Sequence, residues 1–207
     1  MKKIMFNDKF GLTDAVLQGR KTVTRRIVTD EIFGESSIES NPPRIDEIQR
    51  GVNSKYIKSH LAKYNQGEVL AVAQRYKDII DTLKEPYMTD AKCWMPNSAG
   101  WNNKMFVKAE FMPYQIKIPD VRVERIQDIT DEDCIREGIT KLTDKERGHS
   151  YGVVLSEDEI LWLGFTPSEA FSFLIDKISG KGTWDRNPYV FRYELELQPN
   201  TPDEAWK

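Results

Sequence analysis

The sequence is poor in the residues that hold metals and disulfides. It has two cysteines, Cys93 and Cys134, and two histidines, His60 and His149, among 207 residues. The cysteines lie far apart in the chain and form no CxxC motif, and two histidines do not complete a zinc-ligand pattern. This composition excludes a disulfide-stapled scaffold and a zinc-finger class of protein. We therefore expect no metal and no cofactor.

Long apolar runs are also missing. The run Ile4-Met5-Phe6 stops at Asn7-Asp8-Lys9, which is too short for the hydrophobic region of a signal peptide. No segment approaches the roughly 20 apolar residues that a membrane-spanning helix needs. A hydrophobic content of 39% fits one globular domain spanning residues 1–207. These features predict a cytoplasmic protein without membrane contacts, and we expect a monomer.

The sequence has no overall excess of positive charge. Its net charge is −3, which argues against a protein that binds nucleic acid over its whole surface. Residues 1–26 nevertheless hold seven lysines and arginines against two aspartates, a local charge of +5 that leaves −8 for the rest of the chain. A local basic surface on an acidic body can attract a phosphate or nucleotide without non-specific contacts elsewhere. The partner that this distribution favours is an RNA or a nucleoside.

One stretch of eight residues, 19–26 with the sequence GRKTVTRR, combines four cations with two hydroxyls. An amphipathic run that begins at Thr13 predicts a helix before it, and Gly19 stands where a helix commonly ends with positive φ. Residues 22–24 are all β-branched, which predicts a strand. Residues 20–21 therefore lie in a turn between helix and strand, where side chains can face a cleft.

Lys21 and Thr24 are three residues apart, so both side chains can face that cleft. A threonine hydroxyl is a weak nucleophile unless a base removes its proton, and a lysine with a lowered pKa is such a base. Positive charge on Arg20, Arg25 and Arg26 would lower the pKa of Lys21, and these arginines would also bind an anionic or carbonyl-rich ligand. The competing interpretation is a solvated basic turn, because Lys-x-x-Thr is a common spacing and charge clusters usually face water.

Glu137 is a further candidate for chemistry. Thr130 followed by acids at 131–133 predicts a short helix with a threonine N-cap, and Gly138 ends this helix just after Glu137. The helix dipole disfavours a carboxylate at the C-terminal end. This misfit hints that Glu137 has a cationic partner such as Lys21. The acids at 131–133 need no partner, because the first turn of a helix favours negative charge.

Trp184 is a candidate for stacking on a nucleobase. It lies in a polar segment broken by glycines, residues 180–188, and every base offers a π face to an aromatic ring. The alternative is that this tryptophan holds the loop against the core, as large aromatics beside glycine and proline commonly do.

Alternating apolar residues elsewhere predict strands. The set Tyr114, Ile116 and Ile118 changes parity after Pro119-Asp120, a shift that indicates a bulge or tight bend in a strongly curved sheet. In the closing strand, the apolar residues alternate with polar ones; the apolar set is Tyr189, Phe191, Tyr193, Leu195 and Leu197, and the polar set is Arg192, Glu194 and Glu196.

Three polar segments with glycine, proline and serine predict irregular insertions at about 29–66, 77–104 and 140–164. A capping box at 166–169 opens a helix that runs to Gly180. The other predicted strands follow one another along the chain and do not alternate regularly with helices, as they would in βαβ units. The expected fold class is therefore α+β, with a small curved antiparallel or mixed sheet or barrel, short flanking helices and long loop insertions.

The stretch Gly19-Arg20-Lys21-Thr22-Val23-Thr24-Arg25-Arg26 resembles the signature of the ASCH domain, a PUA-like β-barrel family associated with RNA. Three further segments resemble this family in the same order. Residues 64–70 are similar to its "GD-apolar" strand; residues 121–133 with 137–139 are similar to its second strand and helix; Trp184 with 187–191 is similar to the closing strand of larger members from phages and prophages. The resemblance implies one PUA-like barrel domain that carries the three insertions.

Some small bacterial ASCH proteins are N4-acetylcytidine amidohydrolases that use a lysine and a threonine of this motif with a downstream glutamate. These positions correspond to Lys21, Thr24 and Glu137. The resemblance implies that Thr24 attacks the acetyl carbonyl, that Lys21 is its base, and that Glu137 orients the site or transfers a proton. Arg26, also at a shared position, would steady the oxyanion or the nucleoside.

The sequence departs from the family in two ways. It is much longer than the small amidohydrolases, so its insertions could cover, narrow or block the site. Larger members often carry an acid and a tryptophan after the second strand, whereas residues 72–76 here read VAQRY, without an acid. A ligand contact made there in relatives would be missing from this chain.

Three functions remain open on these grounds. The first is an amidohydrolase acting on an N-acylated pyrimidine nucleoside such as N4-acetylcytidine. The second is a non-catalytic module that binds RNA or a modified base. The third is a ribonuclease, which ranks last because no histidine lies near the motif to supply acid–base cleavage.

Overall fold

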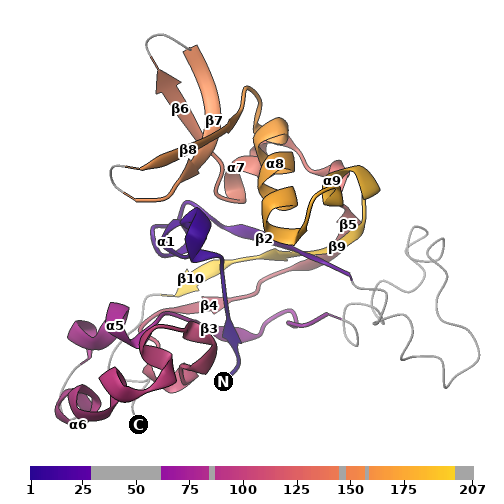
Figure 1. Ribbon diagram of the computed structural model, residues 1–207. Coiled ribbons are helices and arrows are strands. Elements are labelled where there is room, and N and C mark those ends of the chain that lie inside the picture. Colours follow the sequence, from indigo (N-terminus) through magenta and orange to yellow (C-terminus); the bar gives the residue numbers. More distant parts are fainter. Residues whose placement is uncertain (29–61, 84–86, 145–147, 157–158, 199–207) are drawn as a thin grey trace, which may run out of the picture.

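The computed structural model describes residues 1–28, 62–83, 87–144, 148–156 and 159–198, and the fold is α+β (Figure 1). The strands are β1 (Lys3–Ile4), β2 (Val23–Ile27), β3 (Val69–Val72), β4 (Gln115–Lys117), β5 (Val121–Arg125), β6 (Thr140–Asp144), β7 (Gly148–Val154), β8 (Ile160–Gly164), β9 (Tyr189–Glu194) and β10 (Glu196–Gln198). The α-helices are α1 (Leu12–Leu17), α5 (Tyr76–Ile79), α6 (Tyr87–Trp94), α7 (Asp131–Arg136), α8 (Pro167–Ser179) and α9 (Thr183–Arg186).

Short 3₁₀ turns connect these elements. They are η1 (Asp8–Phe10), η2 (Ile80–Thr82), η3 (Met95–Asn97), η4 (Ala99–Trp101), η5 (Lys104–Phe106), η6 (Ala109–Phe111) and η7 (Ile126–Asp128). Four of them follow one another between 95 and 111, where proline and glycine interrupt the helical segments.

The described strands form three sheets. The first has the order β1-β3-β4-β10, in which β1 runs parallel to β3 and the other pairs are antiparallel. The second has the antiparallel order β2-β9-β5. The third is the antiparallel sheet β6-β7-β8, which lies at the top of Figure 1 above α7 and α8. Across the described ranges no closed barrel is formed.

Two bent segments of the chain connect the first sheet with the second. One passes from β4 to β5 through Pro119 and Asp120, and the other passes from β9 to β10 through Leu195. At the bends the backbone N–H of Glu194 donates to the carbonyl of Asp120 (3.0 Å), and that of Leu195 donates to Thr22 (2.9 Å). The alternation of apolar residues therefore shifts by one position after Ile118 because the chain leaves one sheet for the other there. This confirms the predicted bend.

The prediction of an irregular segment at 140–164 is wrong, because most of these residues form the β6-β7-β8 sheet. Glycines obscured the alternation that would have indicated strands. A Cβ at Gly152 would collide with the backbone of Leu161 on the neighbouring strand, and one at Gly164 would meet Glu169 and Ala170 of α8. These glycines permit close approach of backbones instead of ending the strands.

The segment 77–104 was also predicted to be irregular, yet it carries α6 and several short helical turns. A second hydrophobic cluster orders this part of the chain; its buried members are Ala71, Ala73, Tyr76, Ile79, Leu83, Ala91, Met95, Val107 and Met112. Gly100 lies against the ring of Tyr76, where a side chain would not fit. Of the insertion expected at 29–66, residues 29–61 lie outside the described residues.

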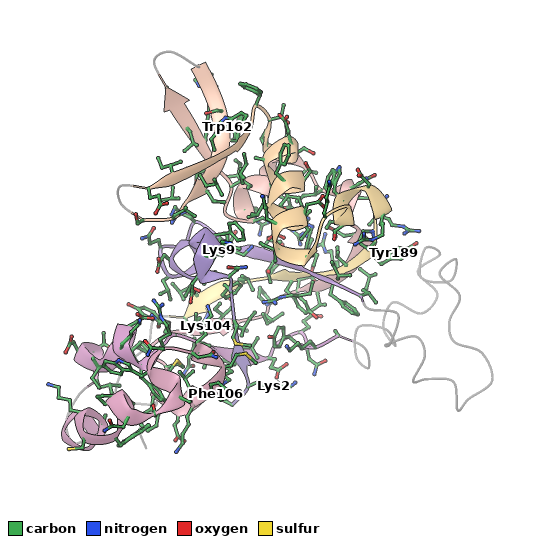
Figure 2. All side chains as sticks on the ribbon, in the orientation of Figure 1. Lys2, Lys9, Lys104, Phe106, Trp162 and Tyr189 are labelled. Atoms are coloured by element: carbon green, nitrogen blue, oxygen red, sulfur yellow. The ribbon has the colours of Figure 1, made fainter. Side chains whose placement is uncertain are left out.

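The main core lies between the first two sheets and α8. Helix α8 begins with the predicted cap, since Thr166 Oγ1 accepts a hydrogen bond from the backbone N–H of Glu169 (3.1 Å). Its buried residues Ala170, Phe171, Leu174 and Ile175 belong to the same hydrophobic cluster as Val190, Phe191 and Tyr193 of β9. Exposed aromatics lie elsewhere: Figure 2 shows Trp162 and Phe106 at opposite ends of the molecule.

Candidate functional site

A pocket of about 350 Å³ lies between the edge strand β2 and helix α8, next to the residues that follow β1. Its charged residues come from the N-terminal motif and from the end of α7, and its apolar wall comes largely from α8. The lining consists of Met5, Phe6, Asn7, Leu12, Lys21, Thr24, Arg25, Arg26, Ile27, Glu137, Phe171, Leu174, Ile175, Ile178 and Ser179. The structure therefore brings together Lys21, Thr24 and Glu137, as the sequence predicted.

Lys21 is placed by the turn between α1 and β2. Helix α1 ends before Gly19, whose φ of +72° is the positive value that the sequence predicted. The backbone N–H of Lys21 then donates to the carbonyl of Ala15 (2.8 Å), and that of Thr22 donates to Arg136 (2.8 Å). These bonds turn the Lys21 side chain inward, and only 3% of this residue is exposed.

The Lys21 ammonium makes two contacts with Glu137. Its Nζ donates to the backbone carbonyl of Glu137 (2.8 Å) and forms an ion pair with the Oε2 atom of the same residue. Burial lowers the pKa of Lys21, and the positive charges of Arg26 and Arg25 act in the same direction; the Glu137 carboxylate opposes them without cancelling the shift. Lys21 itself is therefore buried instead of solvated, whereas Gly19 in the same turn is exposed.

Glu137 is the C-cap of α7. Thr130 caps the other end of this helix, with its Oγ1 accepting from the N–H of Asp133, as predicted. The Oε1 atom of Glu137 accepts from Arg25 Nη1 (3.1 Å), and its Oε2 atom contacts Lys21. The partner expected from the unfavourable helix dipole is thus present, and it is the predicted lysine together with one arginine.

Thr24 lies on β2 opposite Tyr193 of β9, and 5% of it is exposed. Within the part of the chain that the structure describes, its hydroxyl makes no hydrogen bond, although it lines the pocket. A hydroxyl that makes no such bond and borders a cavity is free to contact a bound ligand. Lys21 lines the same pocket, but its Nζ bonds to Glu137 and makes no hydrogen bond to this hydroxyl among the described residues.

Arg25 lines the pocket, but carboxylates engage its guanidinium from several sides. Its Nε donates to Glu124 Oε1 (2.7 Å), its Nη2 to Asp133 Oδ2 (2.6 Å) and its Nη1 to Glu137. Arg192 of β9 holds the same Asp133 from the other side through its Nε (2.9 Å). Arg25 therefore holds these carboxylates in position, and few of its hydrogen-bond donors remain for a ligand.

Asp133 and Arg192 are residues that sequence reasoning missed. Asp133 was interpreted as an ordinary first-turn acid, whereas it lies between two largely buried arginines. Burial alone would raise the pKa of Asp133, but hydrogen bonds from Arg192 and Arg25 outweigh that effect and hold the pKa well below its usual range. The sequence held one sign of this burial. Val190 is apolar and lies on the same face of β9 as Arg192, which indicates that both faces of this strand are covered.

Arg26 connects β2 to the segment after β1. Its Nη2 donates to the carbonyl of Met5 (2.6 Å), and its guanidinium lies over the ring of Phe6, 5.9 Å from the ring centroid. Its Nε is buried without a hydrogen-bond partner among the described residues. This arginine lines the pocket beside Met5 and Phe6.

Two predicted ligand-binding residues do not line this pocket. Arg20 donates from Nε to Gln18 (2.9 Å) and borders a different cavity, beside Asp131 and Tyr151. Trp184 lies in α9, and its ring packs edge-to-face with that of Phe171, the ring centroids being 6.2 Å apart. Its contact with the core corresponds to the structural alternative described above.

Comparisons with known proteins give no relative. No family model matches the chain, and neither a curated protein nor a solved structure matches it. Among the described residues, no group of three or more histidine, cysteine, aspartate and glutamate side chains is arranged to hold a metal ion. In the same residues we find no helix with the length and hydrophobicity needed to cross a membrane.

Gly138 is expected to be needed for the position of Glu137. Its φ is +102°, and an added Cβ would lie 3.6 Å from the Cβ of Lys21. Gly138→Ala should lower the free energy of unfolding by about 1–3 kcal/mol, because an L-residue is strained in this conformation. Gly67→Ala is the matched control, since Gly67 also has positive φ (+83°) but is next to no residue that lines the pocket. Urea unfolding measures both costs, and equal stability of Gly138→Ala and the wild type would contradict the prediction.

Proposed function

We propose that the pocket between β2 and α8 binds a pyrimidine nucleoside and hydrolyses an N-acyl amide on its base, as in N4-acetylcytidine. We further propose that the two connected sheets belong to a PUA-like, ASCH-type fold. One observation carries the functional proposal: a buried lysine with a lowered pKa and a threonine hydroxyl without a hydrogen-bond partner line the same pocket. The pocket has the concave shape, apolar wall and few polar groups of a small-molecule site.

In the proposed reaction, Thr24 Oγ1 attacks the acyl carbonyl carbon while Lys21 Nζ takes the hydroxyl proton. The resulting tetrahedral intermediate collapses, the bond from carbon to N4 breaks, and the base leaves as the amine after receiving the proton from Lys21. Water then attacks the acyl carbon of the threonine ester while Lys21 Nζ takes a proton from the water; the bond from this carbon to Thr24 Oγ1 breaks, and Lys21 returns the proton to Oγ1. The products are the free nucleoside and a carboxylic acid, and Thr24 is regenerated.

Glu137 has a supporting role in this scheme. Its carboxylate contacts the Lys21 ammonium and is held by Arg25, so it stabilises the positive charge that forms on Lys21 after proton transfer. The same contacts fix the direction of the Lys21 side chain. Arg26, two residues from Thr24 on the same strand, supplies a further cation to the pocket.

The direct test is to incubate the purified chain with N4-acetylcytidine and to follow the release of cytidine and acetate by liquid chromatography. We expect turnover by the wild type and background rates for Lys21→Ala, Thr24→Ala and Glu137→Ala. Full activity of all three variants would reject the proposed site. A wild type without turnover on N4-acylated pyrimidine nucleosides would reject the reaction.

The pH dependence follows from the environment of Lys21. The active base is the neutral amine, and burial lowers the pKa of Lys21 from its ordinary value of 10.5. Below that lowered pKa, kcat/KM should rise about tenfold for each pH unit, because the neutral fraction rises in that proportion. It should level off at a pH below 10.5. An initial-rate profile measures this limb, and a rate that falls as pH rises would contradict Lys21 as base.

One observation favours a second candidate, a non-catalytic module that binds a base or an RNA. The Lys21–Glu137 ion pair stabilises the protonated lysine, which is the form that cannot act as a base. A binding module predicts nucleoside or RNA binding that weakens with salt and no hydrolysis of any acylated ligand. Calorimetric titration with cytidine and with single-stranded RNA separates this candidate from the enzyme.

A further inference from the structure

The charged groups around the pocket balance one another except at one residue. Four cations and four carboxylates form a connected set when Lys21 is protonated, and all of them are joined by salt bridges; the cations are Lys21, Arg25, Arg136 and Arg192, and the carboxylates are Glu124, Asp133, Glu137 and Glu194. Arg26 lines the pocket outside this set. Within the described ranges, no carboxylate forms a salt bridge with it.

The Arg26 guanidinium also has unused hydrogen-bond donors. Its Nη2 donates to the carbonyl of Met5, but its Nη1 makes no hydrogen bond to the described residues and is not among the buried atoms. Its Nε is buried without a partner. The accessible Nη1 is therefore the donor that a ligand acceptor can reach.

We propose that Arg26 binds an anionic group of the substrate, and that this group is the phosphate monoester of a mononucleotide. The inference rests on the proposed function and names the charge of its substrate. The planar guanidinium presents paired donors that match phosphate oxygens. The substrate class is therefore an N4-acylated cytidine monophosphate instead of the neutral nucleoside.

The placement of Arg26 suits a ligand of that length. Arg26 follows Thr24 by two residues on β2, so both side chains leave the same face of the strand, roughly 7 Å apart along it. The arginine side chain extends this distance further. The apolar residues of α8, among them Leu174 and Ile178, line the pocket for the uncharged base and sugar. A mononucleotide can thus place its amide at Thr24 and its phosphate at Arg26.

The test compares two product-like probes, cytidine and cytidine 5′-monophosphate, by isothermal titration with the full chain. We expect the monophosphate to bind the wild type about tenfold to a hundredfold more tightly, as charge-assisted hydrogen bonds would give. Added salt should reduce this preference, and inorganic phosphate should compete with the monophosphate for the site at Arg26. Arg26→Gln should abolish the preference, whereas Arg20→Gln, which removes a cation from the same motif outside the pocket, should keep it.

Equal affinity for the two probes in the wild type overturns the inference, and so does a preference that survives in Arg26→Gln. The comparison within the wild type needs no variant, so it holds even if Arg26→Gln unfolds through loss of its bond to Met5. The binding result is separate from the reaction. Monophosphate preference without hydrolysis rejects the proposed function and keeps the anion site; hydrolysis of N4-acetylcytidine without monophosphate preference keeps the function and rejects the site.

Discussion

Thr24→Val is expected to reduce the hydrolysis of N4-acetylcytidine by at least about 10³-fold, because it removes the nucleophilic oxygen and little else. Valine has the shape of threonine and keeps the β-branched side chain that suits β2. The Thr24 hydroxyl has no hydrogen-bond partner in the described part of the chain, so its loss leaves no other group unpaired. Single-turnover rates with excess enzyme measure the chemical step directly.

Thr24→Ser is the matched control, since serine retains a hydroxyl at the same position. We expect it to keep measurable activity, and we expect both variants to unfold within about 1 kcal/mol of the wild type. If Thr24→Val kept more than a tenth of the wild-type rate, Thr24 would not be the nucleophile. A stable Thr24→Val protein that binds cytidine normally and does not turn over would identify the loss as chemical.

Asp133→Asn is expected to lower the free energy of unfolding by about 3 kcal/mol at neutral pH. Asp133 accepts hydrogen bonds from Arg25 Nη2 (2.6 Å) and from Arg192 Nε (2.9 Å). Removing its charge leaves these two largely buried guanidinium groups without their shared counter-ion, and this imbalance is the main cost. Urea unfolding followed by circular dichroism measures the difference.

The stability lost in Asp133→Asn should be smaller at low pH than at neutral pH. The pKa of Asp133 is lowered in the folded chain from its ordinary value of 3.8, so its contribution to stability is fully present above that value. It is lost as the pH falls below 3.8 toward the lowered pKa. Asp131→Asn is the control, because Asp131 is an exposed acid in the same helical turn. Equal unfolding midpoints for the two variants at neutral pH would contradict the prediction.

Local signals accounted for the elements that carry the site. The β-branched run at 22–24 and the glycine at 19 predicted the turn that holds Lys21, because capping and strand preferences act over a few residues. The dipole argument for Glu137 predicted a cationic partner, and Lys21 is that partner. Both successes concern residues whose neighbours in the sequence already restrict the backbone.

The errors concern contacts between distant segments. Residues 140–164 form a sheet because Gly152 and Gly164 allow neighbouring backbones to approach, and a glycine carries no apolar signal. Arg192 alternates with aromatic residues in β9, yet 6% of it is exposed because Asp133 of α7 covers it. Neither the close approach nor the covering helix can be read from the segment itself.

The sequence by itself determined that this chain is an α+β protein. It also located the turn between helix and strand in the motif and identified the residues that could supply a nucleophile and a base. Only the tertiary structure decided that the motif is buried beside Glu137, 116 positions away, and that Arg25 serves a charge network while Arg26 has no carboxylate partner among the described residues. The physical reason is that burial and charge pairing depend on long-range packing. The chemistry of GRKTVTRR depends on which of its cations are compensated, and the fold sets that compensation.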